Sequence, residues 1–410
     1  MLLLGGLLAC TGATPGVIDT GTCATTTTPD PRNPAGVTAW VSLDGPDGPV
    51  RARVRLPGTD GVNGTIAVVV HGAWDAEGTA LDEGDATVAT AGGRTVVHFD
   101  LPGGDTPGDV PATAGVDDRR GPVARAVLAT VLRWAAGETP DVEGCRLGER
   151  VPDADGPLVL VGTSNGGNLA FATLADPALA LPDLAGVVAW ETPAAPGFAT
   201  VQWGRRDPLY VPHTCARGTD GAITCALPDT PLALRPDGEP CFDRDADGCD
   251  DGDVRLAGVR DPLTRRRMLA PELVEALDAA GLRRQDVAAA EEARGWWAAR
   301  DASQAAADAV ARHPALPYLL VASVQDHVLP YPDHPHVHGL GESLQAAGAP
   351  WVRLNPGRAW LREARGENPD DMVFSLAHGT GRLLSEAEEA PLEDALGAAV
   401  DELAARAGTP

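Results

Sequence analysis

The sequence predicts an α/β protein built on a doubly wound, mostly parallel β-sheet that is interrupted by an inserted cap. Three observations support this fold class. Continuous apolar runs, typical of buried parallel strands, alternate with segments of helical periodicity. The alternation stops between residues 197 and 313 and then resumes, which indicates an insertion. With 44% hydrophobic residues, the chain can also bury a large core.

The expected elements follow in chain order. Residues 37–56 alternate between apolar and polar positions on either side of a DGPDG turn, which predicts a β-hairpin. Short apolar runs predict further strands at 65–72, 94–99, 157–162, 184–190, 316–323 and 351–354. Apolar residues spaced about 3.6 positions apart or Ala-rich composition predict helices at 122–136, 165–174, 271–311, 334–347 and 386–405. The chain therefore divides into a leader and linker, a first core part, an inserted cap and a second core part, at 1–34, 35–196, 197–313 and 314–410.

The N-terminal segment predicts export. Residues 1–10 read MLLLGGLLAC, and their last four residues resemble the bacterial lipobox, in which the cysteine becomes lipidated. A Thr- and Pro-rich stretch over 20–34 has the composition of a linker. We therefore expect a cell-envelope lipoprotein or a secreted protein that contacts the membrane only through a lipid on Cys10. The alternative is an unstructured apolar N-terminus.

Cysteine usage is also typical of an exported protein. Removing Cys10 from the seven cysteines leaves six, which can form up to three disulfides in an oxidising compartment. Six cysteines allow 15 pairings. Proximity along the chain favours Cys215–Cys225 and Cys241–Cys249, which leaves Cys23 for Cys145. A cytosolic protein with free thiols is the alternative.

The charge balance restricts the partners. The chain has a formal net charge of −26, and all of its basic residues are arginine. A strongly acidic surface repels phosphates, so we expect no nucleic-acid partner.

Ser164 is the strongest candidate for a catalytic residue. Residues 162–167 read GTSNGG, which matches G-x-S-x-G directly after an expected buried strand and before an expected helix. The tight turn requires small flanking residues and lifts the serine hydroxyl above the sheet edge. The following helix directs its N-terminus, including the Asn165 N–H, at a developing oxyanion. The alternative is an ordinary glycine-rich turn.

Other polar residues follow other expected strands. His71 and Gly72 end an early strand and are followed by Ala73 and Trp74. Asp326 lies just beyond the expected strand 316–323, and His378 is the last histidine in the chain. Glu191 follows the expected strand 184–190 and is a second candidate for an acid.

Together these motifs resemble the α/β-hydrolase superfamily over roughly residues 36–405, apart from the insertion. The resemblance implies a triad of Ser164, Asp326 and His378, in the chain order nucleophile, acid, base. It also implies an oxyanion hole formed by Asn165 with Ala73 or Trp74. In this mechanism, His378 takes the proton of Ser164, which attacks a carbonyl to form an acyl-enzyme that water releases.

The form G-x-S-N-G-G is similar to the corresponding turn of the prolyl oligopeptidase family and of dienelactone-hydrolase-like and acetyl-esterase-like enzymes. The segment before the core is too short for the propeller of the oligopeptidases, so we expect a carboxylesterase acting on a small-molecule ester. A peptidase or amidase acting on a peptide is the second interpretation. A non-catalytic cell-surface binding protein is the third.

An acidic motif in the insertion predicts a calcium loop. Residues 241–253 read CFDRDADGCDDGD, which contains the D-x-D-x-D-G pattern of a calcium-binding turn. The motif resembles the loops of thrombospondin type-3 and dockerin modules, and implies Asp243, Asp245, Asp247 and Asp251 as ligands of a structural Ca²⁺. The EF-hand glutamate is replaced by Val254. A solvated acidic loop is the alternative, and we expect no cofactor for catalysis.

Overall fold

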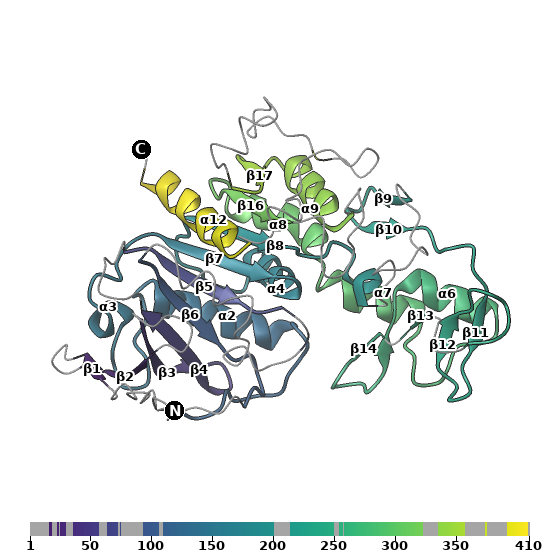
Figure 1. Ribbon diagram of the computed structural model, residues 1–410, viewed down its shortest axis with the longest axis horizontal. Helices are drawn as coiled ribbons and strands as arrows, with labels where there is room; N and C mark the ends of the chain where they lie inside the picture. Colours follow the sequence, from purple (N-terminus) through teal and green to yellow (C-terminus); the bar gives the residue numbers. More distant parts are fainter. Residues whose placement is uncertain are drawn as a thin grey trace, which may run out of the picture.

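The computed structural model describes residues 16–18, 23, 25–29, 36–56, 64–72, 74, 93–105, 110–200, 214–249, 254–256, 258–322, 335–356, 374 and 392–408. Over these residues, a ten-stranded mixed sheet carries helices on both faces (Figure 1). The predicted fold class, a doubly wound and mostly parallel α/β sheet, is therefore confirmed.

The sheet begins with an antiparallel part and continues as a parallel one. From edge to edge the order is β1 (Gly16–Ile18), β2 (Thr25–Pro29), β3 (Val37–Gly45), β4 (Gly48–Leu56), β6 (Thr95–Phe99), β5 (Ile66–Val70), β7 (Leu158–Thr163), β8 (Gly186–Trp190), β16 (Tyr318–Val321) and β17 (Val352–Leu354). Pairing is antiparallel from β1 to β6 and parallel from β6 to β17. Because the central parallel strands are buried on both faces, their sequences are largely apolar: β5 reads IAVVV and β7 reads LVLVGT.

Alternate residues of these strands point to opposite faces of the sheet. Val68 and Leu160 contribute to a large core that is shared with α2 (Pro122–Ala135), α4 (Asn165–Ala175), α8 (Ala302–Arg312) and α9 (Pro335–Ala346). Val69 and Val161 face the opposite way and pack against α12 (Leu392–Ala407). Figure 1 shows α12 lying across this second face near β7 and β8.

The segment between β8 and β16 leaves the sheet. It contains α5 (Pro196–Thr200), the paired strands β9 (Cys215–Arg217) and β10 (Ile223–Cys225), the three-stranded group β11 (Leu232–Leu234), β12 (Pro240–Phe242) and β13 (Val254–Arg255), and the pair β14 (Val259–Arg260) and β15 (Arg267–Met268). Next come α6 (Pro271–Ala279), α7 (Ala290–Ala298) and α8. The expected helical stretch 271–311 is thus three helices, because Gly281 adopts a φ of +70° and Asp301 caps a new helix by accepting a hydrogen bond from Ser303 N.

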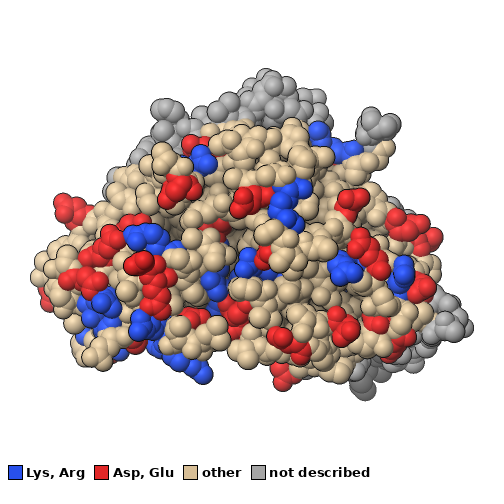
Figure 2. Space-filling view, turned by 180° about the vertical axis from the view of Figure 1, so that it is seen from behind, with Lys and Arg blue, Asp and Glu red and all other residues tan. Residues whose placement is uncertain are grey.

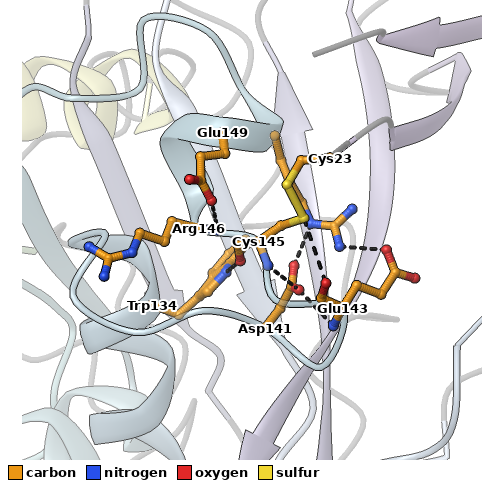
Figure 3. Close-up of a disulfide and its surroundings, with 8 residues drawn as sticks. Cys23, Trp134, Asp141, Glu143, Cys145, Arg146 and Glu149 are labelled. Carbon is orange, nitrogen blue, oxygen red and sulfur yellow. Dashed lines mark hydrogen bonds and ion pairs between the residues drawn. A yellow bond between two sulfur atoms is a disulfide. The ribbon is translucent and has the colours of Figure 1, made fainter. Parts of the chain in front are cut away.

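Part of the expected linker joins the sheet. Thr25–Pro29 forms β2 and pairs with β3, and Cys23 is bonded to Cys145 in the loop before the short helix α3 (Leu147–Arg150) (Figure 3). The Asp141 carboxylate organises that loop, since it accepts hydrogen bonds from Cys145 N (3.0 Å) and from the Arg150 side chain. The N-terminal strands are therefore fixed covalently to the core.

All three disulfides have the predicted pairing: Cys215–Cys225 and Cys241–Cys249, which proximity favoured, and the remaining pair Cys23–Cys145. Cys10 lies outside the described residues. Within the described part of the chain, no helix combines the length and apolarity needed to cross a bilayer. Acidic and arginine side chains are interspersed over the face shown in Figure 2.

Candidate functional site

Ser164 occupies a sharp turn between β7 and α4. Its backbone has φ +48° and ψ −122°, a region that non-glycine residues rarely adopt and that costs roughly 1–3 kcal/mol. Its N–H donates to the carbonyl of Trp190 (2.7 Å), which fixes the turn to the neighbouring strand β8. The half-buried serine is at the N-cap of α4, but its side chain makes no capping hydrogen bond. The hydroxyl is therefore not engaged in capping the helix.

Three glycines allow this turn to fit between its neighbours. A Cβ on Gly162 would lie 2.4 Å from the Cα of Gly167, and a Cβ on Gly166 would lie 2.1 Å from the carbonyl oxygen of Val70. A Cβ on Gly167 would lie 1.8 Å from Oγ1 of Thr192. Close approaches of the backbone therefore require Gly162 and Gly166, and the side chain of Thr192 leaves no room for a Cβ on Gly167.

The strand end after β5 passes directly beside Ser164. A Cβ built on Gly72 would lie 3.0 Å from the Cβ of Ser164, so a side chain there would press against the serine. Of the three predicted oxyanion donors, Asn165 and Trp74 are described, and Ala73 lies outside the described residues. Asn165 is buried in the first turn of α4, where backbone N–H groups are free of intrahelical partners. The structure therefore brings Gly72, Ser164 and Asn165 together.

Glu191 stands beside Ser164 at the carboxyl edge of the sheet. It directly follows β8, whose Trp190 is in register with Thr163 of β7. Its N–H donates to the carbonyl of Val321 (2.8 Å), its side chain is buried, and its φ is +43°. Asp326 and His378, the predicted acid and base, lie outside the described residues, and only the strand β16 that precedes Asp326 is described.

The insertion packs against the end of β5 through aromatic rings. The ring centroids of Trp74 and Trp296 are 5.8 Å apart, and those of Trp74 and Trp297 are 5.7 Å apart. Trp297 is buried and donates to the carbonyl of Leu269 (2.9 Å), so it anchors the helices of the insertion. Trp296 is partly exposed. The guanidinium of Arg300 lies over its ring in a cation–π contact, at 3.8 Å from the ring centroid. The insertion therefore contacts the loop that contains the predicted oxyanion donors.

Two arginines before α2 reach the same loop, and the sequence alone did not identify them. Arg120 is buried and donates from Nη2 to the carbonyls of His71 (3.2 Å) and Gly72 (2.7 Å). Arg119 donates to the carbonyl of Trp74 and forms an ion pair with Asp117 (2.9 Å). Burial raises the pKa of Asp117, although its contact with Arg119 opposes the shift. The only sequence signal is the charged run that precedes the helix at Pro122.

The acidic motif of the insertion gathers three carboxylates. One oxygen of each of Asp243, Asp245 and Asp247 lies within 4.8 Å of the others, and the segment is closed by the Cys241–Cys249 disulfide. Asp243 is buried, whereas Asp245 and Asp247 are exposed. These three residues can hold a metal ion. Asp251, the fourth predicted ligand, lies outside the described residues.

Comparisons with known proteins give structural likeness only. No protein-family model matches the chain, and no curated protein matches its sequence. The structure resembles a carboxyl esterase from Tuber melanosporum (14% identity, 91% of this chain and 88% of that chain, TM-score 0.41) and an esterase from Pyrobaculum calidifontis (15%, 90% and 86%, TM-score 0.40).

A third match is an α/β serine hydrolase without a lid from Xanthomonas campestris, at 23% identity and a TM-score of 0.28. The match covers 38% of this chain and 62% of the Xanthomonas protein, which is less than two thirds of that protein's length. At these identities and scores, the likenesses say nothing about activity or substrate.

Proposed function

We propose that the protein is an exported serine hydrolase that cleaves carboxylic esters of small molecules through an acyl-enzyme on Ser164. The observation that supports this most directly is the strained turn at Ser164, between a buried strand and the N-terminus of α4. Strained non-glycine residues cluster at active sites, because the surrounding structure must maintain them against their conformational cost. Here the turn holds a serine hydroxyl that is not engaged in capping the helix.

In the proposed mechanism, His378 removes the proton of Ser164 as the serine oxygen attacks the ester carbonyl. Asp326 orients the imidazole and stabilises its cation. The resulting oxyanion accepts hydrogen bonds from the N–H groups of Asn165 and of Ala73 or Trp74. The alcohol leaves with a proton from His378, and water then releases the acid from the acyl-enzyme. The insertion over 197–313 acts as a cap of this site.

The test starts with a fluorophosphonate probe, which should label Ser164 in the wild-type protein but not in Ser164→Ala. We expect Ser164→Ala and His378→Ala each to lower kcat for p-nitrophenyl esters by several orders of magnitude, and the double variant to be little worse, because the triad acts as one unit. Full ester hydrolysis by a folded Ser164→Ala protein would exclude this function. Faster turnover of aminoacyl amides than of esters would favour a peptidase or amidase.

The identity of the acid is tested by two matched amide variants. Asp326→Asn should lower kcat strongly, because an amide presents the wrong hydrogen-bond partner to the imidazole. Glu191→Gln should cost less than about tenfold, or roughly 1.4 kcal/mol of barrier. The buried position of Glu191 beside Ser164 makes this comparison necessary. The reverse pattern would move the role of the acid to Glu191 and leave the hydrolase function intact.

We also propose that the three-aspartate turn binds a structural Ca²⁺, with Asp251 as a further ligand. Among the described residues, Oδ1 of buried Asp243 has no hydrogen-bond partner, and Oδ2 accepts only from Gly248 N (3.0 Å). Calcium prefers such carboxylate oxygens. Millimolar Ca²⁺ should raise the melting temperature of EDTA-treated protein, because it binds only the folded state. Asp243→Asn should abolish this rise, whereas Asp229→Asn, at an exposed position elsewhere in the insertion, should preserve it.

Export is the third part of the proposal. The three disulfides fit an oxidising compartment, and Cys10 is the proposed site of lipid attachment. Thiol titration of denatured, unreduced mature protein should find almost no free thiol. A majority of titratable thiols would contradict export into an oxidising compartment.

A further inference from the structure

The turn formed by residues 117–120 is strained and firmly held. Arg119 and Arg120 have φ values of +53° and +68°, and each costs roughly 1–2 kcal/mol in this left-handed region. Asp117 accepts a hydrogen bond from Arg119 N (2.8 Å), and the Asp118 carboxylate accepts from Val123 N (2.7 Å) at the start of α2. Two consecutive strained residues persist only where the surroundings fix them. Both strained residues direct their guanidinium groups at carbonyls of the loop after β5.

Arg120 holds two successive carbonyls of one loop, those of His71 and Gly72, with a single nitrogen. We call His71, Gly72 and Trp74 the oxyanion loop. In a trans peptide the N–H points opposite to the C=O, so the Gly72 N–H, which shares a peptide with the His71 carbonyl, points away from Arg120. Backbone N–H groups that gather on one side of a turn form a concavity that binds anions, and the Gly72 N–H is placed to contribute to one.

The guanidinium also polarises these peptides. Hydrogen bonds from an ionised donor are stronger than neutral ones, and a carbonyl held in this way makes the N–H of its own peptide a better donor. Arg120 itself is only 1% exposed, so it is too buried to meet a substrate. Any effect it has on the reaction must therefore pass through the peptides that it holds.

A third arginine attaches the insertion to this turn. Arg300 lies between α7 and α8, and its guanidinium donates to three carbonyls. Two belong to the turn, those of Asp118 (2.8 Å) and Arg119 (2.5 Å), and the third is that of Trp296 in the insertion (2.9 Å). It is nearly fully buried, and burial lowers its pKa to about 10 even though Asp118 and Asp261 favour its charge. Contacts therefore run from the insertion through Arg300 to the 117–120 turn and then to the oxyanion loop.

We propose that Arg120 is a positioning residue of the oxyanion hole. It holds the carbonyls of His71 and Gly72 so that the oxyanion loop presents its backbone N–H groups to the oxyanion at Ser164, and Arg300 secures its turn from the insertion. This role rests on the proposed serine hydrolase function. It predicts that Arg120 contributes to binding of the transition state but little to binding of the substrate.

The experiment compares Arg120→Met, Arg120→Lys and Arg300→Met with the wild-type protein in hydrolysis of a p-nitrophenyl ester. The concentration of active sites is first measured by complete reaction with the fluorophosphonate, and kcat is calculated per active site. Loss of one oxyanion donor costs about 10²–10³ in kcat, so we expect a loss of about 10- to 100-fold for Arg120→Met, with KM changed less than about threefold. The affinity for a trifluoromethyl ketone, which forms a tetrahedral adduct, should fall by the same factor as kcat/KM. Arg120→Lys should retain part of the activity, and Arg300→Met should show a smaller loss in the same direction.

Arg125→Met is the matched control. Arg125 lies five residues later on α2, pairs with Asp176 (3.1 Å), and should leave both readouts unchanged. If Arg120→Met does not fold, the proposal is tested with Arg120→Lys and Arg300→Met, by the same measurements of kcat per titrated site and of ketone affinity. A purely structural role would lower the melting temperature while kcat per titrated site and ketone affinity stay at wild-type values, and that result overturns the proposal. Wild-type protein that neither labels at Ser164 nor hydrolyses any ester would instead remove the proposed function, and the positioning role with it.

Discussion

At the scale of single residues, the turn at Ser164 between β7 and α4 depends on backbone groups that have almost no room between them. Gly166 lies against two carbonyl oxygens, and a Cβ there would be 2.1 Å from that of Val70 and 2.6 Å from that of His71. A shift of either oxygen would distort the backbone where the oxyanion loop begins. A methyl group at this position must therefore displace Ser164 or the strand end beside it.

Gly166→Ala should accordingly lower the free energy of unfolding by about 3 kcal/mol, the upper part of the usual range for overpacking. Gly295→Ala is the matched control, because nothing lies within 4 Å of its added Cβ and it is inside helix α7. That variant should gain about 0.5–1 kcal/mol from alanine's better helix propensity. Urea denaturation of both proteins measures the difference, and equal stabilities would contradict the crowding at Gly166.

A second prediction concerns the buried histidine of β6. Burial, together with the nearby Arg55 and Arg53, lowers the pKa of His98 to about 3. Because this pKa is below the unfolded value of 6.5, His98 contributes stability above pH 6.5, which is lost as the pH falls toward 3. At pH 5, protonation in the unfolded chain should cost about 2 kcal/mol relative to pH 8.

His98→Gln should remove this loss. The difference in unfolding free energy between pH 8 and pH 5, measured by urea titration at each pH, should shrink by about 2 kcal/mol relative to wild type. An unchanged difference would mean that His98 is protonated in the folded protein.

The sequence made Ser164 the candidate nucleophile because its motif is local: the glycines lie within six residues, and the expected strand and helix lie directly on either side. It did not identify Arg119, Arg120 or Arg300, because these side chains bind backbone carbonyls, and every residue has a carbonyl. No sequence pattern distinguishes an arginine that holds a distant loop from one that faces solvent. The assignments of Asp326, His378 and Ala73 remain predictions.

At the scale of elements, the apolar runs and helical periods located the core strands and helices to within a few residues. The differences arise where local composition is ambiguous. The Ala-rich stretch 271–311 forms three helices, since Gly281 and Asp301 end one segment and begin another. The Thr-rich segment that contains β2 has a linker's composition, but threonine is β-branched and favours strands when a partner edge is available.

The disulfides give a prediction at this scale, because they close loops of very different length. Cys23 and Cys145 are separated by 122 positions, whereas Cys215 and Cys225 are separated by 10. The chain-entropy model assigns about 5 kcal/mol to the first bond and about 3 kcal/mol to the second. The double variant Cys23→Ser/Cys145→Ser should therefore lose about 2 kcal/mol more stability than Cys215→Ser/Cys225→Ser. Denaturant unfolding of the two variants measures this, and a larger loss for the shorter loop would contradict the model.

At the scale of the whole molecule, the candidate site is assembled from two distant parts of the chain. The oxyanion loop and the 117–120 turn lie within the first 145 residues, and Ser164, Glu191 and the insertion follow later. Parallel pairing of β5 with β7 joins the two parts, because it brings the end of β5 against the turn at Ser164 that follows β7. Arg300 adds a second connection, from the insertion back to the 117–120 turn.

The Cys23–Cys145 bond gives this division a mechanical meaning. If the protein is pulled from its two ends, tension passes through the sulfur atoms, and the enclosed strands β2 to β6 and helix α2 carry no load. Reduction of the bond should release about 420 Å of additional extension in a single-molecule pulling experiment, given about 3.5 Å per extended residue over 122 positions. In the oxidised protein, force therefore acts on the part of the chain that carries Ser164, while the oxyanion loop lies in the enclosed segment and stays shielded. Stretching should separate Ser164 from the oxyanion loop before the enclosed segment unfolds.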